Sequence, residues 1–192
     1  MCAVLFALVT WQVAAHGPLR ALDERLGHAV VGTGAVPSGP AELLADLGDT
    51  VVAVPVLLVA VVSSVLRHRR WRAPLGAALA MVAVPALVVP LKWWIGRAGP
   101  PAMGAGPHDG FFPSGHAATA AVACGAAALL VFRTWWWVVP YVLLNLGVGL
   151  GLVRQGYHWP LDVVGAWSLA GVVLWVQARG WFVPTLPRLP LG

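Results

Sequence analysis

Three short polar motifs interrupt a strongly apolar sequence, and their side chains are of the kinds that carry out acid–base and nucleophilic chemistry. The first motif contains Lys92, the second is Pro113-Ser-Gly-His116, and the third places His158 four residues before Asp162. A spacing of four brings His158 and Asp162 onto one face of a helix. A carboxylate bonded to one imidazole nitrogen fixes the tautomer and leaves the other nitrogen free to attack. The same pair is also typical of a hydrogen bond at a helix start, which Pro160 suits.

The Pro113-Ser114-Gly115-His116 motif predicts a tight turn followed by the N-terminus of a helix. Backbone N–H groups at a helix start point outward and favour an anion. The Ser114 hydroxyl and the His116 imidazole would add a hydrogen-bonding group and a proton donor. The structural alternative is an ordinary helix cap by Ser114. Lys92 ends an apolar stretch, where it would either extend to the lipid headgroups or bind a phosphate group.

The composition predicts that these motifs belong to a membrane protein. The chain of 192 residues is long enough for one domain. It is 59% hydrophobic and 10% charged, whereas soluble domains carry about 25% charged residues. The net charge of +5 does not indicate nucleic acid, because the positions of the charges follow membrane topology. Cys2 and Cys124 lie in apolar stretches without partners at metal-ligand spacing, and we expect no disulfide.

Six apolar stretches predict an all-α fold, a bundle of six transmembrane helices, since crossing a bilayer takes about 20 apolar residues. The first stretch is short and its end resembles a cleavage site. We interpret it as a retained helix, because it lacks the positively charged beginning of a signal peptide. The stretches are 2–15, 51–66, 73–91, 116–132, 135–153 and 160–178.

The charges divide between the two ends of these stretches. With a cytoplasmic N-terminus, all seven acidic residues fall outside, and seven of the twelve Lys and Arg residues fall inside, as the positive-inside rule favours. Lys92, His116 and His158 then emerge at the same outer face, so the topology gathers motifs that are distant in the sequence. We therefore predict an integral, multi-pass plasma membrane protein with its active site facing outside the cytoplasm.

A single membrane-embedded domain is expected over residues 1–192. Within it, residues 17–50 would be an extracytoplasmic connecting segment and residues 183–192 an irregular cytoplasmic tail. Two interpretations of the connecting segment stay open. Three leucines between positions 43 and 47 would lie on one side of a short amphipathic helix at the interface, or the segment would be a plain loop with some membrane contact.

Together the motifs resemble the type 2 phosphatidic acid phosphatase family, whose fold is shared with vanadium-dependent haloperoxidases. The resemblance runs from Lys92 to Ala166, and the six-span layout extends it to most of the chain. The family pattern is Lys, six residues, Arg-Pro; then Pro-Ser-Gly-His; then Ser-Arg, five residues, His, three residues, Asp. The residues that match it are Lys92, Pro100, Pro113–His116, His158 and Asp162.

Both arginines of the family pattern are absent, and their positions hold Gly99 and Leu152. Arg97 and Arg154 lie two residues away from these positions. We expect them to replace the missing cations, with both guanidinium groups pointing into the pocket. Within a regular helix, an offset of two residues would turn a side chain by about 200°, so the replacement requires irregular backbone.

The resemblance implies a membrane lipid phosphatase that hydrolyses a phosphomonoester or a pyrophosphate through a phosphohistidine intermediate, without a metal or another cofactor. His158 would be the nucleophile, Asp162 its orienting group and His116 the general acid. The implied partners are a lipid phosphate substrate and membrane lipids, and no nucleic acid. The phosphate oxygens would be bound by Lys92, Arg97, Ser114, Gly115 and Arg154.

Two alternatives stay open. One is a catalytically impaired relative that binds lipid phosphates or serves as a membrane scaffold, since the pattern arginines are absent. The other is vanadate-dependent halide oxidation in the same pocket, a chemistry that has no need of six membrane spans. Phosphate release from a panel of lipids would separate the phosphatase from the scaffold.

Four arginines, Arg67, Arg69, Arg70 and Arg72, form a cluster between the second and third apolar stretches. The charge asymmetry predicts that this Arg67–Arg72 cluster is cytoplasmic and that Asp109 lies outside. A membrane-impermeant thiol reagent applied to intact cells should therefore label Asp109→Cys and spare Arg69→Cys. Labelling at position 69 but not at position 109 would overturn the whole arrangement.

Overall fold

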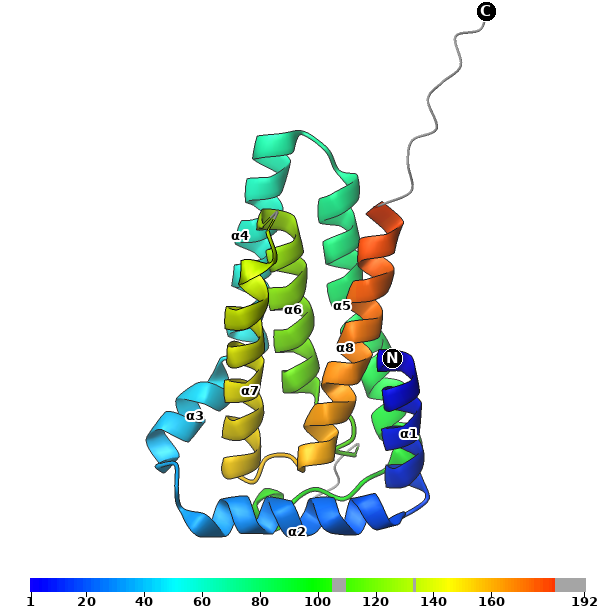
Figure 1. The fold of residues 1–192 in the computed structure, drawn as a ribbon, viewed down its shortest axis with the longest axis vertical. Coiled ribbons are helices and arrows are strands. Elements are labelled where there is room, and N and C mark those ends of the chain that lie inside the picture. Colours follow the sequence, from blue (N-terminus) through cyan, green and yellow to red (C-terminus); the bar gives the residue numbers. More distant parts are fainter. Residues whose placement is uncertain (105–109, 133, 182–192) are drawn as a thin grey trace, which may run out of the picture.

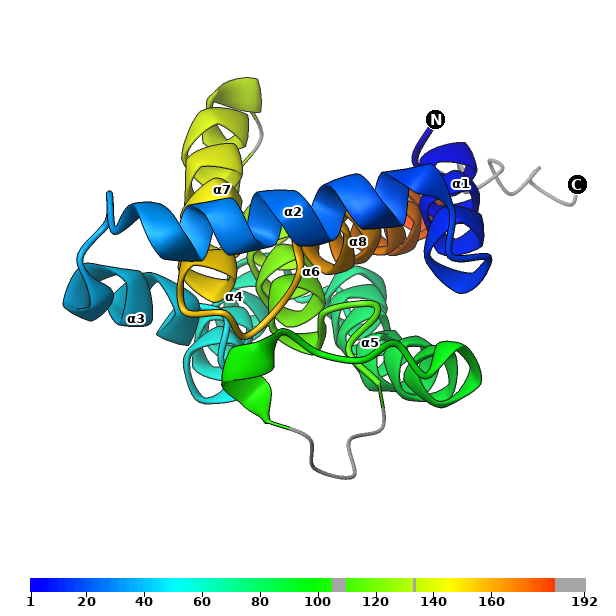
Figure 2. The same ribbon diagram turned by 90° about the horizontal axis from the view of Figure 1, so that it is seen from below.

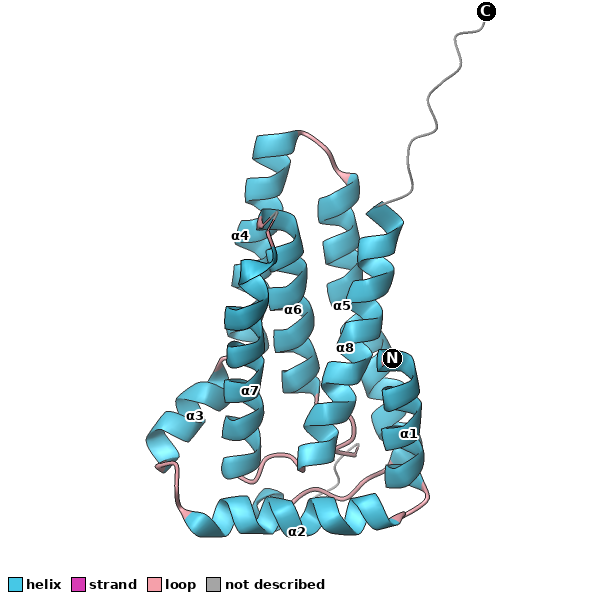
Figure 3. Ribbon diagram, in the orientation of Figure 1, coloured by secondary structure: helices cyan, strands magenta, loops and turns pink. Residues whose placement is uncertain are grey.

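The structure, a computed structural model, describes residues 1–104, 110–132 and 134–181. These residues form helices and the connections between them (Figure 3). Asp109, Arg133 and the expected tail at 183–192 lie outside the described residues. The helices are α1 (Cys2–Ala14), α2 (Pro18–Thr33), α3 (Ser38–Asp46), α4 (Thr50–His68), α5 (Arg72–Ile95), α6 (Gly115–Val131), α7 (Val138–Arg154) and α8 (Pro160–Trp181), with 3-10 turns at Pro101–Met103 and Trp135–Trp137.

The Ala-rich helix α6 lies at the centre of the bundle, and most of its residues are buried. It packs against α4, α5, α7 and α8 (Figure 1). Small side chains let neighbouring helices approach closely. A side chain at Gly125, for example, would overlap Leu174 of α8. Close packing on every side fixes the position of α6, and with it the start of that helix, where the Pro-Ser-Gly-His motif lies.

Four helical segments within the described residues are long and apolar enough to cross a membrane: Thr50–His68, Arg72–Ile95, Trp135–Arg154 and Pro160–Arg179. The pair α1 and α2 passes the same test together but is bent by 85°, and α6 is shorter, at 17 residues. Large apolar side chains such as Leu58 are exposed on the outer faces of these helices, as contact with lipid tails requires. The helical membrane bundle is confirmed, and the count of six spans stays a prediction.

The connection between the first two apolar stretches is helical. Helix α2 lies across one end of the bundle, below α7 and α8 in Figure 1 and crossing them in Figure 2, while α3 packs against α7. The structure thus supports the helical interpretation around positions 43 to 47 and excludes a plain loop over residues 17–50. It also adds α2, which was not expected, although Leu19, Leu22 and Leu26 have the spacing of one helix face.

Exposed tryptophans mark the two ends of the bundle, as in the aromatic belts of membrane proteins. Trp93 and Trp94 lie in the last turn of α5, near the end that α2 crosses. Trp71 lies before α5 at the opposite end, next to the Arg67–Arg72 cluster (Figure 1). The arginine cluster and the ends of the three polar motifs therefore lie at opposite ends of the bundle.

Candidate active site

The two histidines expected to do chemistry lie close together near the starts of α6 and α8. Their ring centroids are 6.5 Å apart. His116 is the second residue of α6, and His158 lies in the connection just before α8. The Ser114 N–H donates a hydrogen bond of 3.0 Å to the carbonyl oxygen of Asp162, and this bond ties the two helix starts together. The structure therefore brings the second and third motifs into one site.

Asp162 holds the His158 ring in a defined orientation. Its Oδ2 atom lies 3.3 Å from His158 Nδ1 and accepts the Trp159 N–H at 3.0 Å. With Nδ1 directed at the carboxylate, Nε2 is the nitrogen left to react. The carboxylate also reaches back to the residue before α8, as a helix-capping side chain does. One geometry therefore satisfies both the orienting and the helix-start interpretations of this pair.

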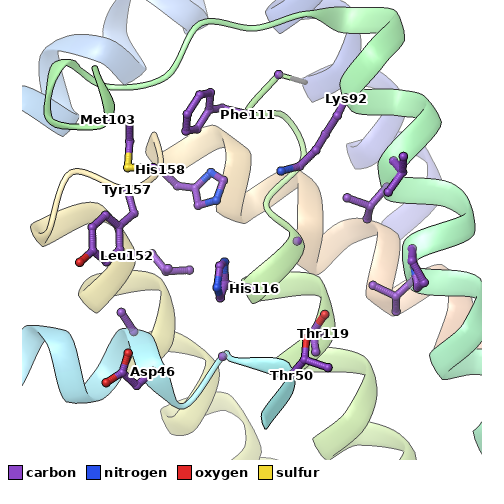
Figure 4. A pocket seen from close by; sticks show the side chains of 18 of the residues that line it. Asp46, Thr50, Lys92, Met103, Phe111, His116, Thr119, Leu152, Tyr157 and His158 are labelled. Atoms are coloured by element: carbon purple, nitrogen blue, oxygen red, sulfur yellow. The ribbon is translucent and has the colours of Figure 1, made fainter. Parts of the chain in front are cut away.

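Lys92 and the two histidines line a cavity of about 960 Å³. Figure 4 shows that the three side chains converge on one space, from α5, from α6 and from the connection before α8. Away from them the wall is mostly apolar, so the cavity has a polar end and an apolar extension. The apolar residues contributed by α5 are Met81, Val82, Val84, Pro85, Val88 and Val89.

Arg97 does not point into this cavity, contrary to the expectation from the sequence. Its Nη1 donates to Asp162 Oδ1 at 2.6 Å and its Nη2 donates to Asp23 Oδ2 at 2.5 Å, and the side chain is fully buried. Helix α5 ends at Ile95, and the next residue, Gly96, lies in the left-handed region with φ of 58°, where glycine is favoured. This helix end turns the chain inward, so that two buried carboxylates, rather than the cavity, receive the guanidinium group.

The other expected phosphate-binding residues are divided between the cavity and its surroundings. Arg154 Nε donates to the Val36 carbonyl at 2.8 Å, so the structure does not show its guanidinium group in the cavity. Ser114 is buried and caps α6, because its Oγ accepts the Ala117 N–H at 3.3 Å. Gly115 lines the cavity as the first residue of α6, where the backbone N–H lacks a partner within the helix. The expected phosphate ligands that line the cavity are thus Lys92 and Gly115.

Packing fills both positions at which the family pattern has arginine. A side chain at Gly99 would overlap the ring of Phe111, which itself lines the cavity. Leu152 is buried and also lines the cavity. An arginine at position 99 would have to displace Phe111, and the leucine presents an apolar surface in place of a cation.

Four polar residues that were not singled out from the sequence also line the cavity: Asp46, Thr50, Thr119 and Tyr157. The Tyr157 hydroxyl donates to Glu42 of α3 at 2.9 Å, and this hydrogen bond is the main cause that raises the pKa of Tyr157. The contact fixes the wall between α3 and the end of α7. Within the described residues, no group of three or more His, Cys, Asp or Glu side chains is arranged to hold a metal ion.

The second carboxylate that binds Arg97 is Asp23, a residue that was not singled out from the sequence. It is 2% exposed and lies on α2, 2.5 Å from Arg97. The signal was present in the sequence, because Asp23 falls among the leucines that define the apolar side of α2. An acidic residue on the apolar face of a helix is expensive to bury without a partner.

Comparisons with known proteins agree with this fold and show the family of the chain. Residues 73–184 match the model of the PAP2 superfamily, and because this match covers more than half of the chain, the protein belongs to that superfamily of phosphatases. Over 74 residues the chain is 35% identical to an undecaprenyl-diphosphatase of Sulfolobus acidocaldarius. The aligned part is 38% of this chain and 34% of that protein, so the chain spans about a third of the relative's length.

The fold matches that of a solved bacterial membrane protein. The crystal structure of a transmembrane PAP2-type phosphatidylglycerolphosphate phosphatase from Bacillus subtilis superposes with a TM-score of 0.80. The match covers 93% of this chain and 94% of that one, at 22% sequence identity. At this level of identity the likeness concerns the fold alone.

The contrast between Lys92 and Arg154 predicts different contributions to phosphate binding. Lys92→Met should remove a charge-assisted contact of about 1.5–3 kcal/mol, which lowers the affinity for inorganic phosphate roughly 10- to 100-fold. Calorimetric titration of the purified protein in detergent measures this affinity. Arg154→Met makes the same change in charge outside the cavity and should alter the affinity by less than about threefold. An equal loss of phosphate affinity in both variants would show that Arg154 also binds phosphate.

Proposed function

We propose that this PAP2 protein is a lipid phosphatase that hydrolyses a phosphomonoester or a pyrophosphate of a membrane lipid through a phosphohistidine intermediate. One observation carries the proposal. His158, oriented by Asp162, shares the polar end of a largely apolar cavity with His116 and Lys92. A nucleophile, a proton donor and a cation thus converge where the headgroup of a lipid could lie, while its chain occupies the apolar extension.

In the first chemical step, His158 Nε2 attacks phosphorus and forms the N–P bond. The bond between phosphorus and the leaving oxygen breaks, and His116 gives its proton to that oxygen. Asp162 accepts the hydrogen bond from Nδ1–H and stabilises the positive charge that develops on the His158 ring. Lys92 and the N–H groups at the start of α6 neutralise the phosphoryl oxygens.

In the second step, water attacks phosphorus and breaks the N–P bond. His116, now neutral, accepts a proton from this water, and inorganic phosphate leaves with His158 regenerated. Phosphoryl transfer depends mostly on positioning and on charge stabilisation. The side chains of the site supply both, so the proposed reaction proceeds without a metal ion.

The shape of the cavity supports a lipid as the substrate. Val82 and Val89 line the cavity and are also 64% and 48% exposed, so the apolar wall continues onto the outer face of α5. A hydrocarbon chain could enter along this face directly from the bilayer. The candidates are phosphatidic acid, phosphatidylglycerol phosphate and a polyprenyl diphosphate. The names of the two similar proteins support the latter two.

The proposed site faces outside the cytoplasm, in the plasma membrane. The support comes from the Arg67–Arg72 cluster, which lies at the end of the bundle opposite α2 and the two histidines. Positive residues accumulate on the cytoplasmic side of membrane proteins, which leaves the histidines at the outer interface, where lipid headgroups are located.

The alternative of an impaired, phosphate-binding relative is not favoured. The pattern arginines are absent, but the nucleophile, its carboxylate, the general acid and the lysine are all present and converge. Phosphate release from a panel of lipid monophosphates and diphosphates, measured with the purified protein in detergent, tests the proposal. Release from no member of the panel would contradict it and favour the binding alternative.

The two histidines should differ in what their loss does to turnover. His158→Ala should abolish phosphate release, because no nucleophile remains. His116→Ala should lower kcat by roughly 10²–10⁴, the usual contribution of a general acid, and less for substrates with good leaving groups. Steady-state kinetics on one lipid and on one activated aryl phosphate measure both effects. Unchanged turnover in His158→Ala would show that another residue attacks phosphorus.

Metal removal and vanadate should have opposite effects on the activity. The proposed reaction uses only side chains and water, so phosphate release should continue in excess chelator. Orthovanadate should inhibit it competitively, because a trigonal-bipyramidal oxyanion bound between the histidines imitates the transition state. Both are measured in the same phosphate-release assay. Loss of activity in chelator that Mg²⁺ restores would rule out the metal-free mechanism.

A further inference from the structure

A row of three buried charges connects α2 to the proposed nucleophile. Arg97 lies between Asp23 and Asp162, with N–O distances of 2.5 and 2.6 Å, and the three side chains are at most 1% exposed. Asp162 in turn contacts His158 Nδ1. The row therefore begins on a helix that lies across the end of the bundle and ends at the ring that the mechanism uses.

Both carboxylate oxygens of Asp23 accept hydrogen bonds. Oδ2 accepts from Arg97, and Oδ1 accepts the Leu161 N–H of the first turn of α8 at 2.7 Å. Burial raises the pKa of Asp23, and the Arg97 guanidinium group at 2.5 Å opposes this shift. A charge-assisted hydrogen bond from Arg97, together with the Leu161 N–H, favours the ionised carboxylate. The position at a helix start also favours a negative charge.

The charges of the row do not cancel. Arg97 carries one positive charge, and the two aspartates carry two negative charges. If Arg97 were paired with Asp162 alone, its charge would neutralise the carboxylate that the His158 ring relies on. Because Asp23 takes one side of the guanidinium fork, one net negative charge remains in the row. Buried charges interact more strongly than charges in water, so this remaining charge matters to the ring.

We propose that Asp23 is a positioning residue for the phosphatase reaction. It shares Arg97 with Asp162, and the Asp162 carboxylate therefore keeps its negative charge toward His158. The inference rests on the proposed function. It assigns to α2 a part in the reaction although α2 contributes no residue to the wall of the cavity. A purely structural role, in which Asp23 only caps α8, is the competing explanation.

Asp23→Asn separates these two roles. The Asn side chain keeps the size and the oxygen that accepts the Leu161 N–H, but its amide nitrogen cannot accept from Arg97 and the net charge of the row falls to zero. We expect kcat for phosphate release to fall about 10- to 100-fold, as for other partners of catalytic groups. KM should change by less than about twofold, since Asp23 does not line the cavity.

Glu24→Gln is the matched control. Glu24 is the neighbouring acid on α2, lies 3.6 Å from Arg97, is 37% exposed and pairs with Arg20. A solvated carboxylate has little influence on a buried charge, so kcat in this variant should stay within about twofold of the wild type. A loss as large as that in Asp23→Asn would overturn the specific role of Asp23.

The double variant Asp23→Asn with Arg97→Gln restores the net negative charge by removing the positive one. The two new amide groups can hydrogen-bond to each other and to Asp162, which keeps the buried polar atoms satisfied. We therefore expect this variant to fold, as thermal unfolding in detergent would show. Its kcat should recover to within about fivefold of the wild type, as non-additive coupling requires. A helix-capping role predicts no recovery. A folded double variant whose kcat stays 10-fold or more below the wild type would therefore overturn the proposal. This comparison with the wild type holds even if the single variant Asp23→Asn does not fold.

The wild-type measurement separates this inference from the proposed function. If the wild type releases phosphate from no lipid, the proposed function fails. If the wild type is active and Asp23→Asn is equally active, the proposed function stands and the role of Asp23 is overturned.

Discussion

Burial of the Arg97 guanidinium group is the constraint on which this end of the molecule depends. A buried cation is very costly unless carboxylates surround it, and the two that do so come from α2 and α8. The end of α5, the start of α8 and the middle of α2 must therefore stay together. The Trp159 indole adds to this connection by donating to the Ala98 carbonyl at 3.1 Å. The orientation of His158 follows from the same contacts, because Asp162 is held from both sides.

Arg97 pairs with Asp23 and Asp162, and its positive charge is therefore not available in the cavity. The family pattern has cations at positions 99 and 152, whereas here Phe111 packs on Gly99 and Leu152 adds an apolar surface. Among the described residues that line the polar end, Lys92 and the start of α6 supply positive potential, together with His116 when it is protonated. The Pro-Ser-Gly-His motif gains importance accordingly, because Ser114 caps α6 through the Ala117 N–H, and Gly115, at the start of that helix, lines the cavity.

The position of α2 relates the site to its surroundings. Leu19, Leu22 and Leu26 are 41% to 50% exposed on a helix that crosses the end of the bundle, an arrangement typical of a helix at a membrane interface. The same helix contributes the buried Asp23. Exposed leucines and a residue of the charge row thus belong to the same helix, and displacement of α2 would leave Arg97 with Asp162 alone.

The sequence by itself determined the all-α class, the apolar stretches and the catalytic candidates. These follow from local properties, since apolar length predicts a span and the spacing of His158 and Asp162 predicts their contact. The sequence did not reveal α2, because its polar residues hide the leucine spacing. It also misplaced Arg97, since the direction of a side chain beyond a helix end depends on the turn at Gly96 and on distant partners. Only the tertiary structure brought Asp23 to Arg97. Pairing a buried charge is a long-range requirement, and residues 74 positions apart in the chain meet it.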